Sequence, residues 1–199
     1  MSKIFIISAP SGCGKTSLVR ELCLSFSFLE QSISYTTREK RDGEISDIDY
    51  FFIDEVSFKK KITNNDFLEY QKVYNNYYGT CAKSVQKILD SNKDAILEID
   101  YKGMLSIKKI LPEAISIYIL PPSIEELEKR LVQRNLDSDD VILNRVSQAK
   151  NELAYKRFSD HIIINDNFEE ASRNLKKLIL SYKFKKNYSI RKILDNNQS

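Results

Sequence analysis

The beginning of the chain combines a short apolar run with a glycine-rich turn that ends in a lysine and a threonine. Residues 4–7 are aliphatic or aromatic, and an apolar helical pattern begins after residue 16. A turn in this setting is typical of loops that bind phosphate, because backbone N–H groups and the helix N-terminus face the anion. The candidate triphosphate-binding residues are Ala9, Pro10, Ser11, Gly12, Cys13, Gly14, Lys15, Thr16 and Ser17. We expect Lys15 to reach the β- and γ-phosphates, and the Thr16 hydroxyl to bind Mg²⁺. The alternative is an ordinary strand-turn-helix in which the lysine occurs by chance.

A second group of residues could bind another phosphate. Arg38 and Arg41 stand three residues apart, and Tyr50 follows nine residues later. Two guanidinium groups and a phenol hydroxyl suit a phosphate group, because arginine donates two parallel hydrogen bonds to such an anion. Two arginines on a solvated loop are the competing interpretation.

Two carboxylates could select a base. Glu69 lies in an apolar and aromatic run, and Asp100 follows an apolar strand-like run. Guanine presents two neighbouring donors, which a carboxylate accepts, and an acceptor that needs a hydroxyl such as that of Ser34 or Thr80. Adenine has the opposite pattern, and sites of this kind reject the wrong partner by about 10⁴–10⁵. The residues are consistent with guanine, although the sequence alone does not bring them together.

The apolar runs predict the elements that position these residues. Residues 4–7, 95–99, 115–119 and 162–164 are isoleucine-rich or aliphatic, as in strands buried on both faces, and 32–35 are expected to add a further strand. Helical patterns lie between them, including one at 82–89 and one at 168–182. Alternating strands and helices predict an α/β fold with a parallel sheet and helices on both of its faces.

Two segments interrupt this alternation. Residues 34–91 carry turn signals and aromatic strand-like runs, and we expect them to form an inserted mixed lobe. Residues 123–155 predict two charged helices that form a lid, with Ser123 and Glu126 as a capping box at the start. The core then comprises about 1–33, 92–122 and 156–185 within a single domain, followed by a basic tail at 186–199. A static pair of surface helices is the alternative to a lid.

Composition excludes several classes of protein. The 199 residues are 42% hydrophobic, and 31 basic against 28 acidic residues leave a net charge of +3. This balance argues against nucleic acid as a partner. No run of 18 apolar residues predicts a membrane span, and the early strand leaves no room for a signal peptide, so we expect a cytoplasmic protein. Three scattered cysteines suggest neither a disulfide framework nor a zinc site, and the one histidine, His161, is expected to be structural.

Taken in order, these motifs resemble those of the guanylate kinases, a family of P-loop nucleoside-monophosphate kinases. The resemblance covers roughly residues 3–180, and alanine at position 9 is usual for this family. The most specific matches are Thr36-Thr37-Arg38 and Tyr77-Tyr78-Gly79-Thr80, accompanied by Glu98-Ile99-Asp100 and Asn165-Asp166. The resemblance implies a three-layer P-loop NTPase-like core with a GMP-binding lobe and a helical lid.

The resemblance also implies the reaction ATP + GMP ⇌ ADP + GDP with Mg²⁺, in purine nucleotide metabolism and GMP recycling. The partners would be ATP and GMP, with the chain a monomer or homodimer. The implied GMP-binding residues are Arg38, Arg41, Tyr50 and Tyr78 for the phosphate, and Ser34, Glu69, Thr80 and Asp100 for the base. The implied residues for ATP and phosphoryl transfer are Lys15, Arg38, Arg134 and Arg145, assisted by Arg130, with Asn165 near the adenine. Glu98 stands where aspartate is common and could bind Mg²⁺ through water, beside Thr16.

Two other functions remain open at this stage. One is a kinase for another monophosphate such as AMP or UMP, against which Glu69 and Asp100 argue. The other is a non-catalytic guanylate-kinase-like module that binds phosphorylated partners through the arginine and tyrosine residues of the lobe. Such modules typically lack a working ATP loop, whereas Gly14, Lys15 and Thr16 are present here.

Overall fold

The computed structural model describes residues 2–73, 75–133 and 139–184 of the chain. Its core is a five-stranded parallel sheet with the strand order β2-β7-β1-β8-β9. The strands are β1 (Ile4–Ser8), β2 (Leu29–Ser32), β7 (Asp94–Glu98), β8 (Ile115–Leu120) and β9 (His161–Ile164). The central strand β1 pairs with β7 on one side and β8 on the other, so the loop that follows β1 emerges at the middle of the sheet.

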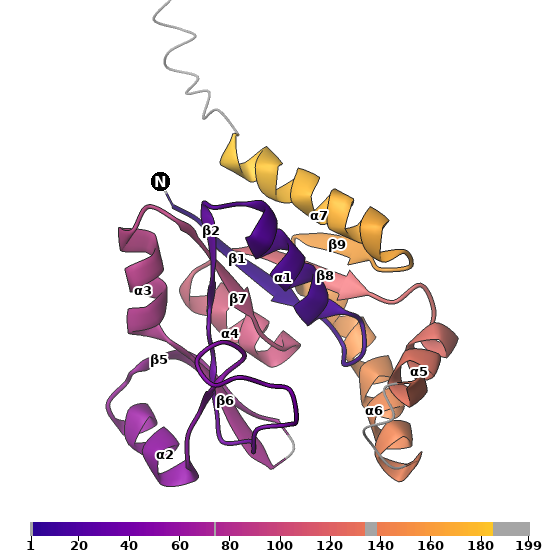
Figure 1. The fold of residues 1–199 in the computed structure, drawn as a ribbon, viewed down its shortest axis with the longest axis horizontal. Helices are drawn as coiled ribbons and strands as arrows, with labels where there is room; N and C mark the ends of the chain where they lie inside the picture. The colour runs from indigo at the N-terminus through magenta and orange to yellow at the C-terminus, as the bar shows by residue number, and fades with distance from the viewer. Residues whose placement is uncertain (1, 74, 134–138, 185–199) are drawn as a thin grey trace, which may run out of the picture.

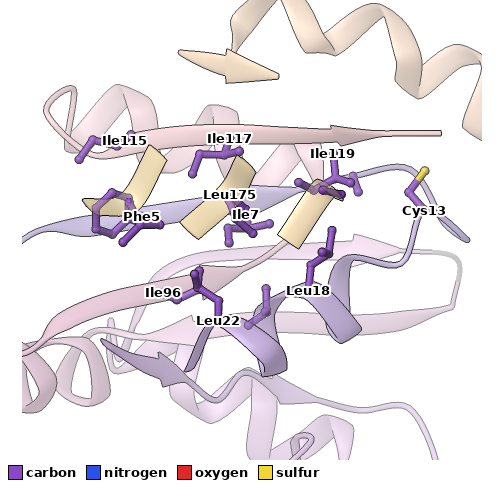
Figure 2. Close-up of a cluster of buried hydrophobic side chains, with 14 of the residues drawn as sticks. Phe5, Ile7, Cys13, Leu18, Leu22, Ile96, Ile115, Ile117, Ile119 and Leu175 are labelled. Carbon is purple, nitrogen blue, oxygen red and sulfur yellow. The ribbon is translucent and has the colours of Figure 1, made fainter. Parts of the chain in front are cut away.

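Helices cover both faces of this sheet, giving the expected three layers (Figure 1). On one face lie α1 (Lys15–Ser25) and α7 (Phe168–Lys183), and on the other lie α3 (Ala82–Asp90) and α4 (Tyr101–Ile110). The side chains of β1 explain why helices cover both faces, because neighbouring residues of a strand point to opposite faces of the sheet. Phe5 and Ile7 pack with Leu18 and Leu22 of α1 (Figure 2), whereas Ile6 packs with Ile107 of α4.

The inserted lobe is built on a second, mixed sheet with the strand order β4-β3-β6-β5. Its elements are β3 (Tyr35–Thr36), β4 (Phe51–Phe52), α2 (Glu55–Thr63), β5 (Phe67–Val73) and β6 (Asn76–Cys81). Aromatic side chains form its interior: the fully buried Phe58 of α2 stacks on Phe67, with ring centroids 4.6 Å apart, and on Tyr77 at 5.3 Å. These contacts hold α2 on the small sheet and fix the strands that carry the candidate GMP-binding residues.

The candidate lid contains the two expected helices, α5 (Ile124–Gln133) and α6 (Asp139–Glu152), followed by the 3₁₀ turn η1 (Leu153–Phe158). The expected capping box at the start of α5 is half formed. The Ser123 hydroxyl accepts a hydrogen bond from the Glu126 N–H at 3.1 Å, but the Glu126 carboxylate pairs with Arg130 one turn later. Residues 134–138, which join the two helices, lie outside the described part of the chain.

The structure corrects two predictions about strands. The segment 32–35 is not one strand: β2 ends at Ser32 in the core sheet, and Tyr35 begins β3 of the second sheet. The strand β9 is an edge strand rather than one buried on both faces, since Ile162 and Ile164 are 46% and 59% exposed. Isoleucine content alone does not distinguish an edge strand from a central one.

His161 has a structural partner, as expected, because its Nε2 lies 2.6 Å from the Tyr182 hydroxyl of α7. Within the described ranges, no helix is both long enough and apolar enough to cross a membrane.

Candidate active site

The glycine-rich turn between β1 and α1 forms an open loop whose shape depends on two glycines. Gly12 and Gly14 have φ angles of 88° and 79°, in the left-handed region that side chains disfavour. Cys13, between them, is 1% exposed and belongs to the core cluster shown in Figure 2. The turn leads directly into α1, so its N–H groups and the helix N-terminus are available to one anion.

Lys15 and Thr16 both reach the end of the neighbouring strand β7. The Lys15 ammonium donates to the Ile99 carbonyl at 3.0 Å, and the Thr16 hydroxyl donates to the Glu98 carboxylate at 2.5 Å. Gln31 of β2 donates to the other Glu98 oxygen at 3.1 Å and orients it. The carboxyl ends of three adjacent strands thus meet at the loop, which is where open α/β sheets bind ligands.

The pairing of Thr16 with Glu98 fits Mg²⁺ in its chemistry. Both side chains offer oxygen, the ligand atom that Mg²⁺ prefers, and Mg²⁺ usually keeps several waters and phosphate oxygens as its remaining ligands. No cluster of three or more His, Cys, Asp or Glu side chains that could hold a metal occurs among the described residues.

Three of the four residues expected at the second phosphate lie together in the lobe. The Arg38 guanidinium lies 5.6 Å from the Tyr50 ring centroid, and the Tyr50 and Tyr78 rings lie 6.0 Å apart, edge to face. Partial burial of the Arg38 guanidinium lowers its pKa. Interactions with Glu44 and Tyr78 outweigh this effect, so the pKa of Arg38 is raised overall. Burial also raises the pKa of Tyr50, so its hydroxyl keeps its proton and is available as a donor. The exposed Arg41 lies on the loop beside this group.

Glu44 organises this phosphate site, although sequence reasoning gave it no role. One carboxylate oxygen accepts from the Arg38 guanidinium at 2.6 Å, and the other accepts from the Arg41 backbone N–H at 2.8 Å. Partial burial opposes its ionisation, yet these hydrogen bonds lower the pKa of Glu44 and keep it charged. In the sequence, Glu44 follows Gly43 and stands three residues after Arg41, and this spacing is the signal that could have indicated its contact with the arginine loop.

The residues expected to contact a base also converge. The buried Thr80 hydroxyl donates to Glu69 at 2.7 Å, across the β5–β6 pair. Asp100 accepts at 2.7 Å from the Gly103 N–H, and a Cβ at Gly103 would lie only 2.9 Å from the second Glu69 oxygen. Ser34, which is 9% exposed, comes directly before β3, and the β3–β6 register places it opposite Thr80. Glu69, Thr80 and Asp100 therefore lie close together between the lobe and the core, with Ser34 on the strand beside Thr80.

Glu69 has an unusual electrostatic setting. Burial raises its pKa to about 7; the Thr80 hydrogen bond lowers it and the nearby Asp100 charge raises it. A bound partner with two N–H donors would favour the charged carboxylate and reverse this shift. Glu152, at the end of α6, is a second carboxyl whose pKa is raised to about 7, by burial and by Asp100, although Lys15 lowers it. No pattern in the sequence singled out Glu152.

The remaining expected ATP-binding residues are placed differently. Arg130 and Asn165 lie beside the phosphate loop and bond to backbone carbonyls of the protein. Arg145 belongs to α6, but its side chain is outside the described part of the structure, as is Arg134 entirely. The roles expected for these two arginines therefore remain predictions.

One α/β scaffold thus carries a candidate phosphate loop, a second candidate anion site and a candidate base site rich in acceptors. The family model described as guanylate kinase matches residues 1–182. This chain belongs to the guanylate kinase family. The guanylate kinase of Hydrogenovibrio crunogenus is 47% identical over 178 residues, which cover 89% of this chain and 87% of that protein. That of Coxiella burnetii is 42% identical over 192 residues, or 96% of this chain and 93% of the relative.

The fold agrees with this family. The crystal structure of the guanylate kinase from Anaplasma phagocytophilum matches with a TM-score of 0.78 at 27% identity, covering 93% of this chain and 88% of that one. Guanylate kinase membership is thus supported over nearly the whole chain, including both the core sheet and the inserted lobe.

Proposed function

We propose that this protein transfers the γ-phosphoryl group of ATP to GMP, in the reaction ATP + GMP ⇌ ADP + GDP. The observation that carries the proposal is the group formed by Glu69, Thr80 and Asp100, in which two carboxyls lie next to a phosphate-binding lobe. Carboxylates accept the N1–H and amino donors of guanine, and adenine would leave them unpaired. Membership of the guanylate kinase family supports the same reaction.

The mechanism relies on positioning and charge, with no covalent intermediate. Arg38, Tyr50 and Tyr78, joined by Arg41, hold the GMP phosphate, which attacks the γ-phosphorus in line. Lys15 and the loop N–H groups bind the ATP phosphates and stabilise the charge that develops during transfer. Arg134 and Arg145 approach from the lid in this proposal, and closure excludes water that would otherwise hydrolyse ATP.

The same proposal includes Mg²⁺, which Thr16 would hold directly and Glu98 through water. When bound, the ion neutralises phosphate charge. The Thr16 hydroxyl donates to the Glu98 carboxylate, so both oxygen-bearing side chains lie together beside the loop.

A coupled assay of ADP release, with ATP and Mg²⁺ and with GMP, AMP, UMP or no acceptor, tests this function. We expect strong release with GMP alone. Release with AMP or UMP instead would keep the kinase but overturn the guanine assignment. GMP binding without ADP release would indicate the non-catalytic interaction module.

A further inference from the structure

The phosphate-binding loop is held from two sides by residues distant from it in the sequence. A Cβ atom at Gly12 would lie 2.9 Å from Leu131 Cδ2 of α5, and one at Gly14 would lie 2.6 Å from Asn165 Nδ2. Both distances are shorter than real Cβ contacts, so neighbouring groups occupy the space beside each glycine. The loop conformation therefore depends on α5 on one side and on the turn between β9 and α7 on the other.

Asn165 makes the most direct contact with the loop backbone. Its backbone N–H donates to the Leu120 carbonyl at 2.7 Å, which fixes the residue at the end of the core sheet. Its side-chain Nδ2 donates to the Cys13 carbonyl at 2.8 Å, and both residues are buried. In a trans peptide the C=O and N–H groups point in opposite directions. Holding the Cys13 carbonyl towards Asn165 therefore turns the Gly14 N–H away from it.

Arg130 in turn holds the segment that carries Asn165. Its Nη1 donates to the Asn165 carbonyl at 2.8 Å, and its Nη2 donates to the Asp166 carbonyl at 3.2 Å. The remaining guanidinium nitrogen, Nε, donates to the Glu126 carboxylate at 2.9 Å. All three nitrogens are thus engaged within the protein, and the contacts connect α5 to the β9–α7 turn.

We propose that Asn165 and Arg130 are positioning residues for the phosphate-binding loop: Arg130 fixes the turn, and the Asn165 amide fixes the Cys13–Gly14 peptide. Neither side chain needs to contact the nucleotide for this effect. The inference rests on the proposed function in one respect, namely that the loop binds a triphosphate. It assigns Asn165 to the phosphates, through the backbone, whereas the family resemblance implied a place near the adenine.

Tripolyphosphate distinguishes a role of Asn165 at the phosphates from a contact with the adenine, because it has the phosphates of ATP but no base. Calorimetric titration of Mg²⁺-tripolyphosphate into the wild-type protein, Asn165→Ala and Asn165→Asp measures the loop directly, without turnover. Asn165→Asp keeps the shape of the side chain but has no N–H to donate. Loss of one buried hydrogen bond predicts about tenfold weaker binding for both variants, and an equal loss for ATP. Unchanged tripolyphosphate binding, with weaker ATP binding, would overturn the proposal in favour of a base contact.

Asn167→Ala is the matched control, since it removes the same side chain two residues away. Asn167 caps α7, where its side-chain oxygen accepts from the Glu170 N–H at 3.0 Å. Losing the cap should lower the melting temperature by a few degrees and leave tripolyphosphate binding unchanged. If Asn167→Ala weakened tripolyphosphate as much as Asn165→Ala, general destabilisation would explain both and the proposal would fail.

A double variant tests the connection through Arg130. Arg130→Ala with Asn165→Ala should weaken tripolyphosphate binding no more than the stronger single variant, because both act through the same peptide. Losses that multiply would mean that Arg130 binds phosphate on its own, which contradicts its positioning role. Failure of the wild-type protein to convert GMP to GDP would overturn the proposed function instead, and it is measured in a separate reaction.

Discussion

At the level of single residues, the role proposed for Glu69 in base selection predicts a dependence on pH. Its carboxyl is buried, accepts from Thr80 and lies near Asp100, and burial raises its pKa to about 7. A folded-state pKa above the ordinary value means that the folded protein binds the proton more tightly than the unfolded chain. This contribution to stability is therefore lost as the pH rises from the ordinary carboxyl value through about 7.

GMP binding should have the opposite dependence on pH. Guanine donates two N–H groups and needs the charged carboxylate, so the association constant should fall about tenfold per unit as the pH drops below 7. Above pH 8 it should be constant. Titration calorimetry of GMP over pH 5.5–8.5 measures this. Glu69→Gln is the control that retains the titration of the GMP phosphate itself, and an identical pH profile in that variant would contradict the assignment.

Lys15 carries the second prediction at this scale. Its ammonium donates to the Ile99 carbonyl next to the loop, and the proposed mechanism places its charge at the ATP phosphates. Lys15→Ala should lower kcat by at least about 10²–10³-fold, by analogy with the loss of one group that stabilises transition-state charge. GMP affinity should survive. Lys176→Ala, which removes a lysine paired with Glu21 on the outer helices, should retain turnover; near-normal turnover in Lys15→Ala would refute its role.

At the level of elements, a substitution can separate the observed role of Asp100 from its proposed one. It caps α4 through the Gly103 N–H, and in the proposed function its carboxyl also contacts the base. Asparagine caps helices as well as aspartate does but lacks the charge. Asp100→Asn should therefore weaken GMP binding while leaving the melting temperature nearly unchanged.

Asp100→Ala loses the cap as well, and should cost about 1 kcal/mol of stability in addition. Thermal melts and GMP titrations of both variants make the comparison. If Asp100→Asn bound GMP normally, the residue would be a helix cap and no more.

The elements also show what a sequence can and cannot predict. The phosphate loop was predictable because its residues are consecutive and its strand and helix flank it. Glu98 and Thr16, 82 residues apart, meet only because β1 and β7 are neighbours in the sheet, an order that local patterns do not encode. The contact between Asn165 and Cys13 spans 152 residues and was missed for the same reason. The exposed face of β9 was missed because isoleucine is common on edge and central strands alike.

For the whole molecule, the topology brings two candidate anion sites to the same end of the sheet. The glycine-rich loop follows β1, Asp100 follows β7, and the lobe inserted between β2 and α3 carries the second candidate phosphate site. Figure 1 shows that lobe on one side of the loop and the helices α5 and α6 on the other. In this arrangement one nucleotide can bind the core while another binds the lobe.

Ligand binding should therefore stabilise the molecule in a metal-dependent way. ADP with Mg²⁺ at 100 times its Kd should add about 2.7 kcal/mol, which raises Tm by roughly 5–11 °C for a chain of this size. Adding EDTA should remove most of the rise. GMP is the control. Because its proposed site needs no metal, EDTA should leave the rise in Tm caused by GMP unchanged. An ADP shift that persists in EDTA would contradict the Mg²⁺ site at Thr16 and Glu98.

The central claim is that the γ-phosphoryl group of ATP moves to GMP. The most direct measurement is to incubate the protein with γ-labelled ATP, Mg²⁺ and GMP, and to separate the labelled products. The account predicts label in GDP, with little in inorganic phosphate, and no labelled diphosphate when AMP replaces GMP. Label found only in inorganic phosphate would contradict it, because the protein would then hydrolyse ATP without transferring the phosphoryl group to the second nucleotide.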